Sequence, residues 1–332
     1  MKNAYTDLVL EIAESLNTSK ADEGEIDGVE IETSRCDEND VEVTKIRIVN
    51  DAGVAKMQKP IGCYISISSA ALRYNNISAH EHIIGLLAQH IGDICADFSK
   101  GTTLVIGLGN SNVTPDALGP KVVDKTLVTR HIMQNLPDQM QGNMMSVCAL
   151  APSVMGLTGI ETAEIVRGLV AHVRPTLVIV IDALAARKVS RINSVIQLTD
   201  TGIAPGGGMG NNRMPLNAET LGVPVVAIGV PTVVDAATLV NDTLDLLLDS
   251  MAQNTQSDLA DGRMFFDSLR NLQEKEKYQV IQETLAPYDG NMFVTPKEIG
   301  EVVNWLANII ANGINLGLHP GLDRDDINRF MY

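Results

Sequence analysis

The stretch GTTLVIGLGNSNVTPDALGP, residues Gly101–Pro120, decides the fold class of this chain. Its first part, Thr102–Ile106, is a continuous apolar and β-branched run, which is typical of a strand buried on both faces of a sheet. The run leads into the turn Gly107–Asn110, where glycine permits positive φ or a close approach of the backbone to another group. In open α/β sheets, ligands and chemistry lie just outside the carboxyl ends of the strands. Asp116, in the loop after this strand, is therefore a candidate functional residue.

Further apolar runs alternate with helical patterns along the chain. Leu177–Ile181 and Val223–Val230 read as buried strands, and His80–Phe98 carries apolar residues at the i+3/i+4 spacing of a helix. Thr158 to Glu161 and Thr295 to Glu298 match the capping-box pattern at helix starts. This alternation predicts a three-layer α/β/α fold with a mainly parallel central sheet.

The period of the hydrophobic pattern changes near the N-terminus. Residues 41–67 alternate with a period of two, which predicts a small β-rich N-terminal extension. Residues 253–290 are expected to form a helical or loop insertion that begins with a polar segment. No strong linker divides the chain of 332 residues, so we expect a single α/β domain over residues 8–332.

Composition excludes several classes of function. The net charge of −16 argues against nonspecific binding to nucleic acid or to anionic membranes, which both require clustered Lys and Arg. No apolar run approaches the ~20 residues of a membrane-spanning helix, so no membrane association is expected. The four cysteines are scattered without a CxxC pair, which is typical of reduced thiols in a cytoplasmic protein.

Two aspartates form the sharpest constellation. Asp182 closes the run LVIVID, and Asp116 lies in the loop after LVIGLGN. Neighbouring strands lie about 4.8 Å apart, so loops after adjacent strands can bring two carboxyl groups together. Such a pair shares one proton, and it can deprotonate a water molecule and protonate a leaving amine. In the alternative interpretation, one aspartate caps a helix and the other binds a metal ion or a backbone amide.

Other motifs favour structural roles. Asp235 fits a helix cap, and Asp200 begins a single DTG, whereas pepsin-like proteases need two such motifs, so we interpret Asp200 as a turn residue. The glycines at 107 and 109 lack the rest of GxGxxG, which makes nucleotide binding the weakest hypothesis. The remaining candidates lack a metal or nucleophile spacing, and they are His80, His82, His90 and Cys148.

Six stretches of the chain resemble the germination protease family of endospore-forming bacteria. They are GLGNSNVTPDALGP (107–120), VMGLTGIET (154–162), IDALAAR (181–187), DTGIAPGGGMGN (200–211), ETLGVPVVAIGVPTVVDA (219–236) and VTPKE (294–298). The family is an atypical aspartic endopeptidase family that is related in fold to the hydrogenase maturation proteases. The resemblance implies an endopeptidase that initiates the degradation of small acid-soluble spore proteins during germination.

The resemblance also assigns residues. The catalytic aspartates of the family correspond to Asp116 and Asp182, and no metal or cofactor is implied. The family cleaves after an acidic residue that precedes a large apolar one, and Thr6-Asp7-Leu8 mimics this site. We therefore expect self-cleavage at Asp7–Leu8, with residues 1–7 as the propeptide of a self-processing zymogen. The resemblance further implies a homotetramer in the spore core, without direct contact to nucleic acid.

Some features depart from the family pattern or leave alternatives open. Ser153 and Ala204 stand where we expect Gly and His. The glycine-rich segment Gly206–Gly210 is expected to act as a flexible flap near the cleft. A metal-dependent, maturation-type endopeptidase would use Asp116 and Asp182 as ligands instead of as an acid pair.

Overall fold

A nine-stranded mixed sheet forms the centre of the molecule in the computed structural model. The structure describes residues 6–18, 26–36, 39–95, 98, 101–135, 144–206, 213–253, 280–281, 283–285 and 292–331. The strands are β1 (Val29–Cys36), β2 (Val41–Ile48), β3 (Gly62–Ser68), β4 (Thr102–Gly107), β5 (Ser146–Leu150), β6 (Leu177–Ala186), β7 (Val195–Thr199), β8 (Val225–Asp235) and β9 (Phe293–Val294).

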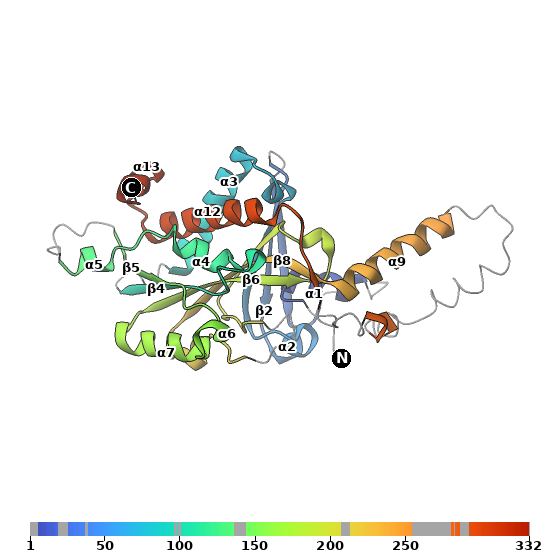
Figure 1. The fold of residues 1–332 in the computed structure, drawn as a ribbon, viewed down its shortest axis with the longest axis horizontal. Helices are drawn as coiled ribbons and strands as arrows, with labels where there is room; N and C mark the ends of the chain where they lie inside the picture. Colours follow the sequence, from blue (N-terminus) through green and yellow to red (C-terminus); the bar gives the residue numbers. More distant parts are fainter. Residues whose placement is uncertain are drawn as a thin grey trace.

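The sheet has a parallel half and an antiparallel half. Its order is β1-β2-β3-β7-β8-β6-β4-β5, and β9 pairs with β8. The strands β8, β6, β4 and β5 run parallel to one another, while β1, β2, β3 and β7 pair antiparallel. The two halves meet where β7 runs antiparallel to β8. The antiparallel strands lie side by side with the parallel ones in one continuous sheet (Figure 1).

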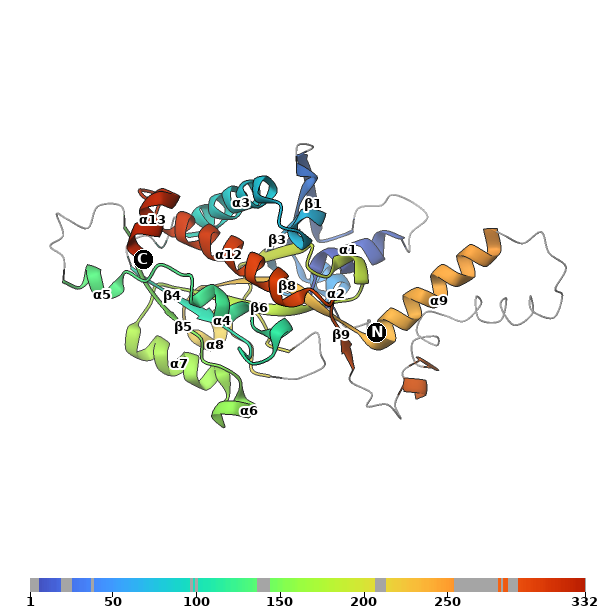
Figure 2. The same cartoon turned by 45° about the horizontal axis from the view of Figure 1, so that its top comes forward.

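Helices cover both faces of the sheet. They are α1 (Val9–Thr18), α2 (Asp51–Met57), α3 (Ile77–Cys95), α4 (Leu118–Val123), α5 (Arg130–Met133), α6 (Met155–Thr158), α7 (Thr162–Val173), α8 (Ala218–Leu221), α9 (Ala236–Gln253), α12 (Ile299–Leu318) and α13 (Arg324–Met331). The helices α3, α4 and α12 lie on one face, and α7 lies on the other (Figures 1 and 2). The predicted three-layer α/β/α fold is confirmed.

Alternating side chains of the central strands fill two separate cores. On β4, Val105 points into the core with α3 and α12, whereas Leu104 and Ile106 point into the core with α7. This is the alternation of a strand that is buried on both faces, and it explains why Thr102–Ile106 is apolar throughout. A third, smaller core joins α1 and α2 to the antiparallel half through residues such as Ile46.

Two strands run further than the sequence pattern suggests. The run Leu177–Ile181 continues as β6 to Ala186, which places Asp182 inside the strand and not after it. Likewise, the run Val223–Val230 continues as β8 to Asp235, and α9 begins only at Ala236. Both extensions pair with each other in parallel, so they form a ribbon of two strands that projects past the end of β4.

The capping boxes inferred from sequence were wrong at two helices. Thr158 ends α6, and α7 starts at Thr162 after Glu161 without a side-chain cap. Thr295 donates to the Thr232 carbonyl oxygen at 2.8 Å instead of capping α12. In both cases a tertiary contact or a second short helix used the residues that the local pattern assigned to a cap.

The N-terminal region is richer than expected. Residues 41–67 do contain two strands, β2 and β3, but the helix α2 lies between them, and β1 adds a further strand before them. The single-domain assignment and the propeptide boundary at residue 7 stay predictions. Most of the insertion proposed for residues 253–290, and its polar first segment after residue 253, lie outside the described residues.

Candidate active site

A glycine turn places Asp116 beside β6. The N–H of Leu108, just after β4, donates to the Ile181 carbonyl oxygen at 2.8 Å, so the loop starts as a continuation of the β4–β6 pairing. Gly109 has φ of 107°, and a Cβ there would lie 2.0 Å from the Asp116 carbonyl oxygen. Only glycine permits this close return of the loop. The Asp116 carboxylate then accepts a hydrogen bond from the Asn110 N–H at 2.8 Å.

Asp182 lies on β6 at the point where β4 ends. Gly107, the last residue of β4, pairs with Ile181, so Asp182 is the first β6 residue beyond the β4 partner. Its side chain is 7% exposed, and Oδ1 accepts from the Ala183 N–H at 2.9 Å. The sequence argument that loops after adjacent strands meet is realised here between the loop after β4 and the body of β6.

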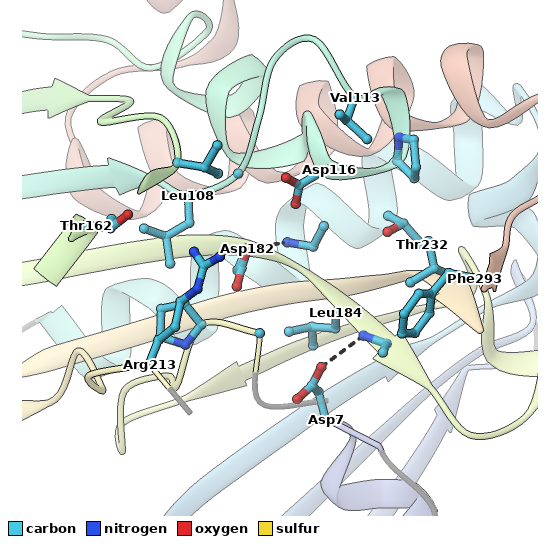
Figure 3. A pocket seen from close by; sticks show the side chains of 18 of the residues that line it. Asp7, Leu108, Val113, Asp116, Thr162, Asp182, Leu184, Arg213, Thr232 and Phe293 are labelled. Atoms are coloured by element: carbon cyan, nitrogen blue, oxygen red, sulfur yellow. Dashed lines mark hydrogen bonds between the residues drawn. The ribbon is translucent and has the colours of Figure 1, made fainter. Parts of the chain in front are cut away.

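Both aspartates line one cavity of about 300 Å³. The Asp116 side chain reaches into it from the loop above β6, and Asp182 reaches into it from the strand (Figure 3). The guanidinium group of Arg213 lies beside the Asp182 carboxyl group (Figure 3). Apolar side chains such as Leu108 and Val113 complete much of the wall. The cavity thus combines acidic groups with a largely apolar lining, as enzyme pockets do.

The electrostatics separate the two acids. Burial, then the Asp116 carboxylate, then the Asp7 carboxylate raise the pKa of Asp182 well above its usual value. Burial also raises the pKa of Asp116, which the Asn110 N–H and Arg213 lower in part. Two like charges in a low-dielectric cavity cannot both ionise easily, so one carboxyl group retains its proton.

The segment that carries Asp7 and Leu8 lies against the extended part of β6. Asp7 lines the same cavity as the two aspartates, and its Oδ2 accepts from the Ala185 N–H at 2.9 Å. Leu8 is fully buried in a small cluster with Leu184 and Val195. The structure therefore brings the expected processing site and the aspartate pair to one part of the molecule.

A buried carboxylate fixes the chain around this segment. Glu11 on α1 accepts hydrogen bonds from the backbone N–H groups of Arg187 at 2.8 Å and Lys188 at 2.7 Å, just after β6. The Thr6 hydroxyl donates to Glu11 and accepts from the Leu8 N–H at 3.1 Å. Burial raises the pKa of Glu11, and these hydrogen bonds lower it.

The structure does not bring the remaining candidates to the cavity. Asp200 accepts from the Cys63 N–H at 2.8 Å, and Asp235 accepts from the Ala237 N–H at 2.9 Å at the start of α9. Both contacts are structural, as the sequence indicated. Within the described part of the chain, no three His, Cys, Asp or Glu side chains gather as a metal site would require, and His80, His82, His90 and Cys148 are included in that search.

Sequence reasoning missed three side chains near the pocket. Arg213 lines the cavity directly after the glycine-rich loop, and Lys59 and Gln197 contact the Asp7 backbone from the antiparallel half. Each is a common residue type outside any recognisable motif. The proximity of Arg213 to a glycine-rich segment was the only available signal.

Ser153 supports the expected departure from the family pattern. This residue lines the cavity and has φ of 67°, in the left-handed region that favours glycine. Ala204 and Gly206 also line the cavity, and the rest of the expected flap, residues 207–210, lies outside the described residues. None of the helices in the described ranges is both long and apolar enough to cross a membrane.

By fold and site, the molecule is an α/β protein with an acidic cavity at the carboxyl edge of its parallel strands. A model of the germination protease family matches residues 7–264 and 251–331. The chain belongs to the germination protease family. It is accordingly a protease of spore germination, and its substrate is protein.

Individual relatives agree with this assignment. A germination protease of Clostridium perfringens (strain 13 / Type A) is 44% identical over 331 residues and is covered in full, as is this chain. A germination protease of Bacillus cereus (strain G9842) is 37% identical, with 98% of this chain and 96% of the relative covered. A solved [NiFe] hydrogenase maturation protease HycI from Thermococcus kodakarensis KOD1 is 17% identical over 68% of this chain and 98% of its own, with a TM-score of 0.30.

Proposed function

We propose that the protein is an aspartic-type endopeptidase in which Asp116 and Asp182 share one proton. The observation that carries this proposal is that the two carboxyl groups, 66 positions apart in sequence (182 − 116), line one cavity, where the charge of Asp116 raises the pKa of Asp182. Asp182 is the more deeply buried acid, so it holds the proton and Asp116 is the ionised partner.

The two acids then have complementary roles. The Asp116 carboxylate takes a proton from a water molecule, whose oxygen bonds to the carbonyl carbon of the scissile peptide. As the carbon–nitrogen bond breaks, the Asp182 carboxyl group gives its proton to the departing amine nitrogen. Arg213 supports this arrangement because its charge lowers the pKa of both acids and keeps one of them ionised.

The substrates are small acid-soluble spore proteins, cleaved after an acidic residue that precedes a large apolar one. Membership of the germination protease family supports this class of substrate. The enzyme would act in the spore core as a homotetramer, for which light scattering should give four times the chain mass. No cofactor is proposed.

The chain is also its own substrate, at the bond between Asp7 and Leu8. Two observations support this proposal: Asp7 has the acidic side chain required before the cleaved bond, and it lines the same cavity as the aspartate pair. Release of residues 1–7 would then convert a zymogen into the mature enzyme.

Substitution of each acid tests the mechanism. We expect Asp116→Asn and Asp182→Asn to lower substrate cleavage and self-cleavage by at least about 10⁴-fold, as for residues that act as a unit. Asp235→Asn is the matched control, because this acid ends the neighbouring strand β8 and contacts the start of α9. Cleavage is followed by mass spectrometry, and circular dichroism checks the fold. Retained cleavage in either variant would refute the acid pair.

A chelator separates the proposed mechanism from the metal-dependent alternative. With Asp116 and Asp182 as an acid pair, dialysis against a chelator leaves the cleavage rate unchanged. Loss of activity that a divalent ion restores would instead assign the two aspartates as ligands.

A further inference from the structure

The carbonyl oxygen of Asp7 is held by two side-chain donors. The ammonium group of Lys59, in the connection between α2 and β3, donates to it at 3.3 Å. The amide nitrogen of Gln197, on β7, also donates to it at 3.3 Å. This carbonyl belongs to the bond between Asp7 and Leu8, so both donors face the oxygen on which charge develops when that bond is hydrolysed.

Gln197 contacts the chain on both sides of Leu8. Its amide oxygen accepts a hydrogen bond from the Val9 N–H at 2.8 Å, while its amide nitrogen donates to the Asp7 carbonyl oxygen. The side chain is 7% exposed, so these hydrogen bonds form where water competes little. One carboxamide therefore fixes the backbone from Asp7 to Val9, as a neighbouring strand would.

The sheet register brings Gln197 next to the catalytic strand. Gln197 and Asp182 both pair with Gly229 of β8, one from each side, so their side chains project from the same face of the sheet. A Cβ on Gly229 would lie 2.6 Å from the Leu184 side chain, so glycine leaves the space that Leu184 occupies between the two. Leu184 in turn contacts Leu8.

The acidic side chain of Asp7 is recognised separately from its carbonyl group. The Asp7 N–H donates to the Ala185 carbonyl oxygen at 3.1 Å, and Asp7 Oδ2 accepts from the Ala185 N–H at 2.9 Å. The pairing of β6 with β8 shifts register between Leu184 and Ala185, next to this contact. Burial lowers the pKa of Lys59, and the Asp7 carboxylate raises it.

We propose that Lys59 and Gln197 form a carbonyl-binding site that polarises and positions the Asp7–Leu8 bond for self-cleavage. This inference rests on the proposed function of Asp116 and Asp182. Lys59 and the Gln197 amide stabilise the negative charge that forms on the Asp7 oxygen when water adds to its carbonyl carbon. The bond from Asp7 carbon to Leu8 nitrogen then breaks, the oxygen charge returns to the carbonyl, and the Leu8 amine receives the proton held by the acid pair.

The experiment uses the full-length chain and follows the appearance of an N-terminus at Leu8 by intact-mass spectrometry. Lys59→Met removes the charge and the donor but keeps the apolar stem, and Lys59→Arg restores a charged donor. Gln197→Glu keeps the acceptor for the Val9 N–H but loses the donor to Asp7. Lys56→Met is the matched control, because Lys56 lies on α2 and pairs with Asp27 at 3.7 Å.

We expect Lys59→Met and Gln197→Glu each to slow self-cleavage on the order of 100-fold, the usual effect of losing one oxyanion donor. Lys59→Arg should recover most of the rate, and Lys56→Met should cleave like the unmodified chain. Wild-type rates in both Lys59→Met and Gln197→Glu would overturn the proposal. So would a slow Lys59→Met variant whose unfolding temperature falls and whose rate Lys59→Arg does not recover, since that result indicates a structural role.

Asp182→Asn in the same series distinguishes this inference from the proposed function. If Asp182→Asn still releases residues 1–7, the acid pair is wrong, whatever the Lys59 variants do. If Asp182→Asn is inactive while Lys59→Met and Gln197→Glu process normally, the acid pair stands and only the carbonyl-binding site fails.

Discussion

The parallel and antiparallel halves of the sheet contribute different chemistry to one place. The parallel half provides the two acids, because β4 ends beside Asp182 and its loop returns with Asp116. The antiparallel half provides neutral and cationic donors, with Gln197 on β7 and Lys59 just before β3. The segment Thr6–Val9 lies between them and contacts both.

The difference teaches how each kind of site is stabilised. In the parallel half, two carboxyl groups oppose each other electrostatically, and the fold compensates for this conflict through the Asn110 N–H, the Ala183 N–H and Arg213. In the antiparallel half, Gln197 uses both ends of its amide in hydrogen bonds to the backbone. Reactivity is expected from the first arrangement and positioning from the second.

The largest effect is expected from Gly109→Ala, which should break the acid side alone. The new Cβ would lie 2.0 Å from the Asp116 carbonyl oxygen at a φ of 107°, so the loop must move. We expect a loss of about 2–4 kcal/mol in the free energy of unfolding and at least about 10³-fold in substrate cleavage, since the acid pair separates. Urea unfolding and a peptide-cleavage assay measure the two effects.

Gly28→Ala is the matched variant in the antiparallel half. Gly28 has φ of 81°, and its Cβ would lie 2.4 Å from the Gly53 backbone nitrogen, so a similar loss of stability is expected. Its folded fraction should cleave substrate within about threefold of the unmodified chain, because Gly28 is remote from the acids. Equal losses of activity in the two variants would contradict the division between the halves.

The next effect is a gain in stability from Asp182→Asn. The pKa of Asp182 in the folded protein lies above its unfolded value of about 3.9, so ionisation opposes folding as the pH rises above that value. Asn keeps the acceptor for the Ala183 N–H without the charge. We expect a gain of about 0.5–2 kcal/mol at pH 7 that disappears as the pH falls toward about 3.9.

Thermal unfolding across this pH range measures the effect. The control is Asp93→Asn, at an exposed position of α3, which should show no comparable pH-dependent gain. A loss of stability at pH 7 in Asp182→Asn would mean that the ionised carboxylate is favoured by the folded state, against the proposed shared proton.

The same division decides what the sequence could predict. Asp116 and Asp182 were identified because each follows a strongly apolar strand, and adjacent parallel strands end at one edge. Lys59 and Gln197 could not be identified, because their role depends on a contact between residue 7 and positions far along the chain. The register of antiparallel strands, which creates that contact, leaves no local sequence signal.

The fold followed a similar rule. Continuous apolar runs predicted β4 and the centres of β6 and β8, since burial on both faces requires them. The extension of β6 through Ala186 was missed because Asp182 interrupts the apolar run. The cap at Thr295 was wrong because its hydroxyl group binds the distant Thr232 carbonyl oxygen, a tertiary contact that overrides the local pattern.

Arg213→Met is expected to have a smaller effect, which sharpens the account of the acid side. Arg213 lowers the pKa of both Asp116 and Asp182, so its removal raises both. The acid limb of the pH–rate profile reports ionisation of the base, and the alkaline limb reports loss of the shared proton. Both limbs should therefore move to higher pH, as measured by initial rates of peptide cleavage. A shift to lower pH would show that Arg213 does not act on the pair through its charge.

The smallest effect is expected from Ser153→Gly, at the rim of the same cavity. Ser153 has φ of 67°, a conformation that costs a non-glycine residue about 1 kcal/mol. Glycine relieves this strain but gains freedom in the unfolded chain, so the net gain in the free energy of unfolding should be about 0.5 kcal/mol. Ser190→Gly, in the 3₁₀-helix Val189–Arg191 without positive φ, should instead lose about 0.5–1 kcal/mol. If urea unfolding gives both variants the same sign, then backbone strain at Ser153 does not govern the stability of this rim, and the serine is retained there through contacts of its side chain.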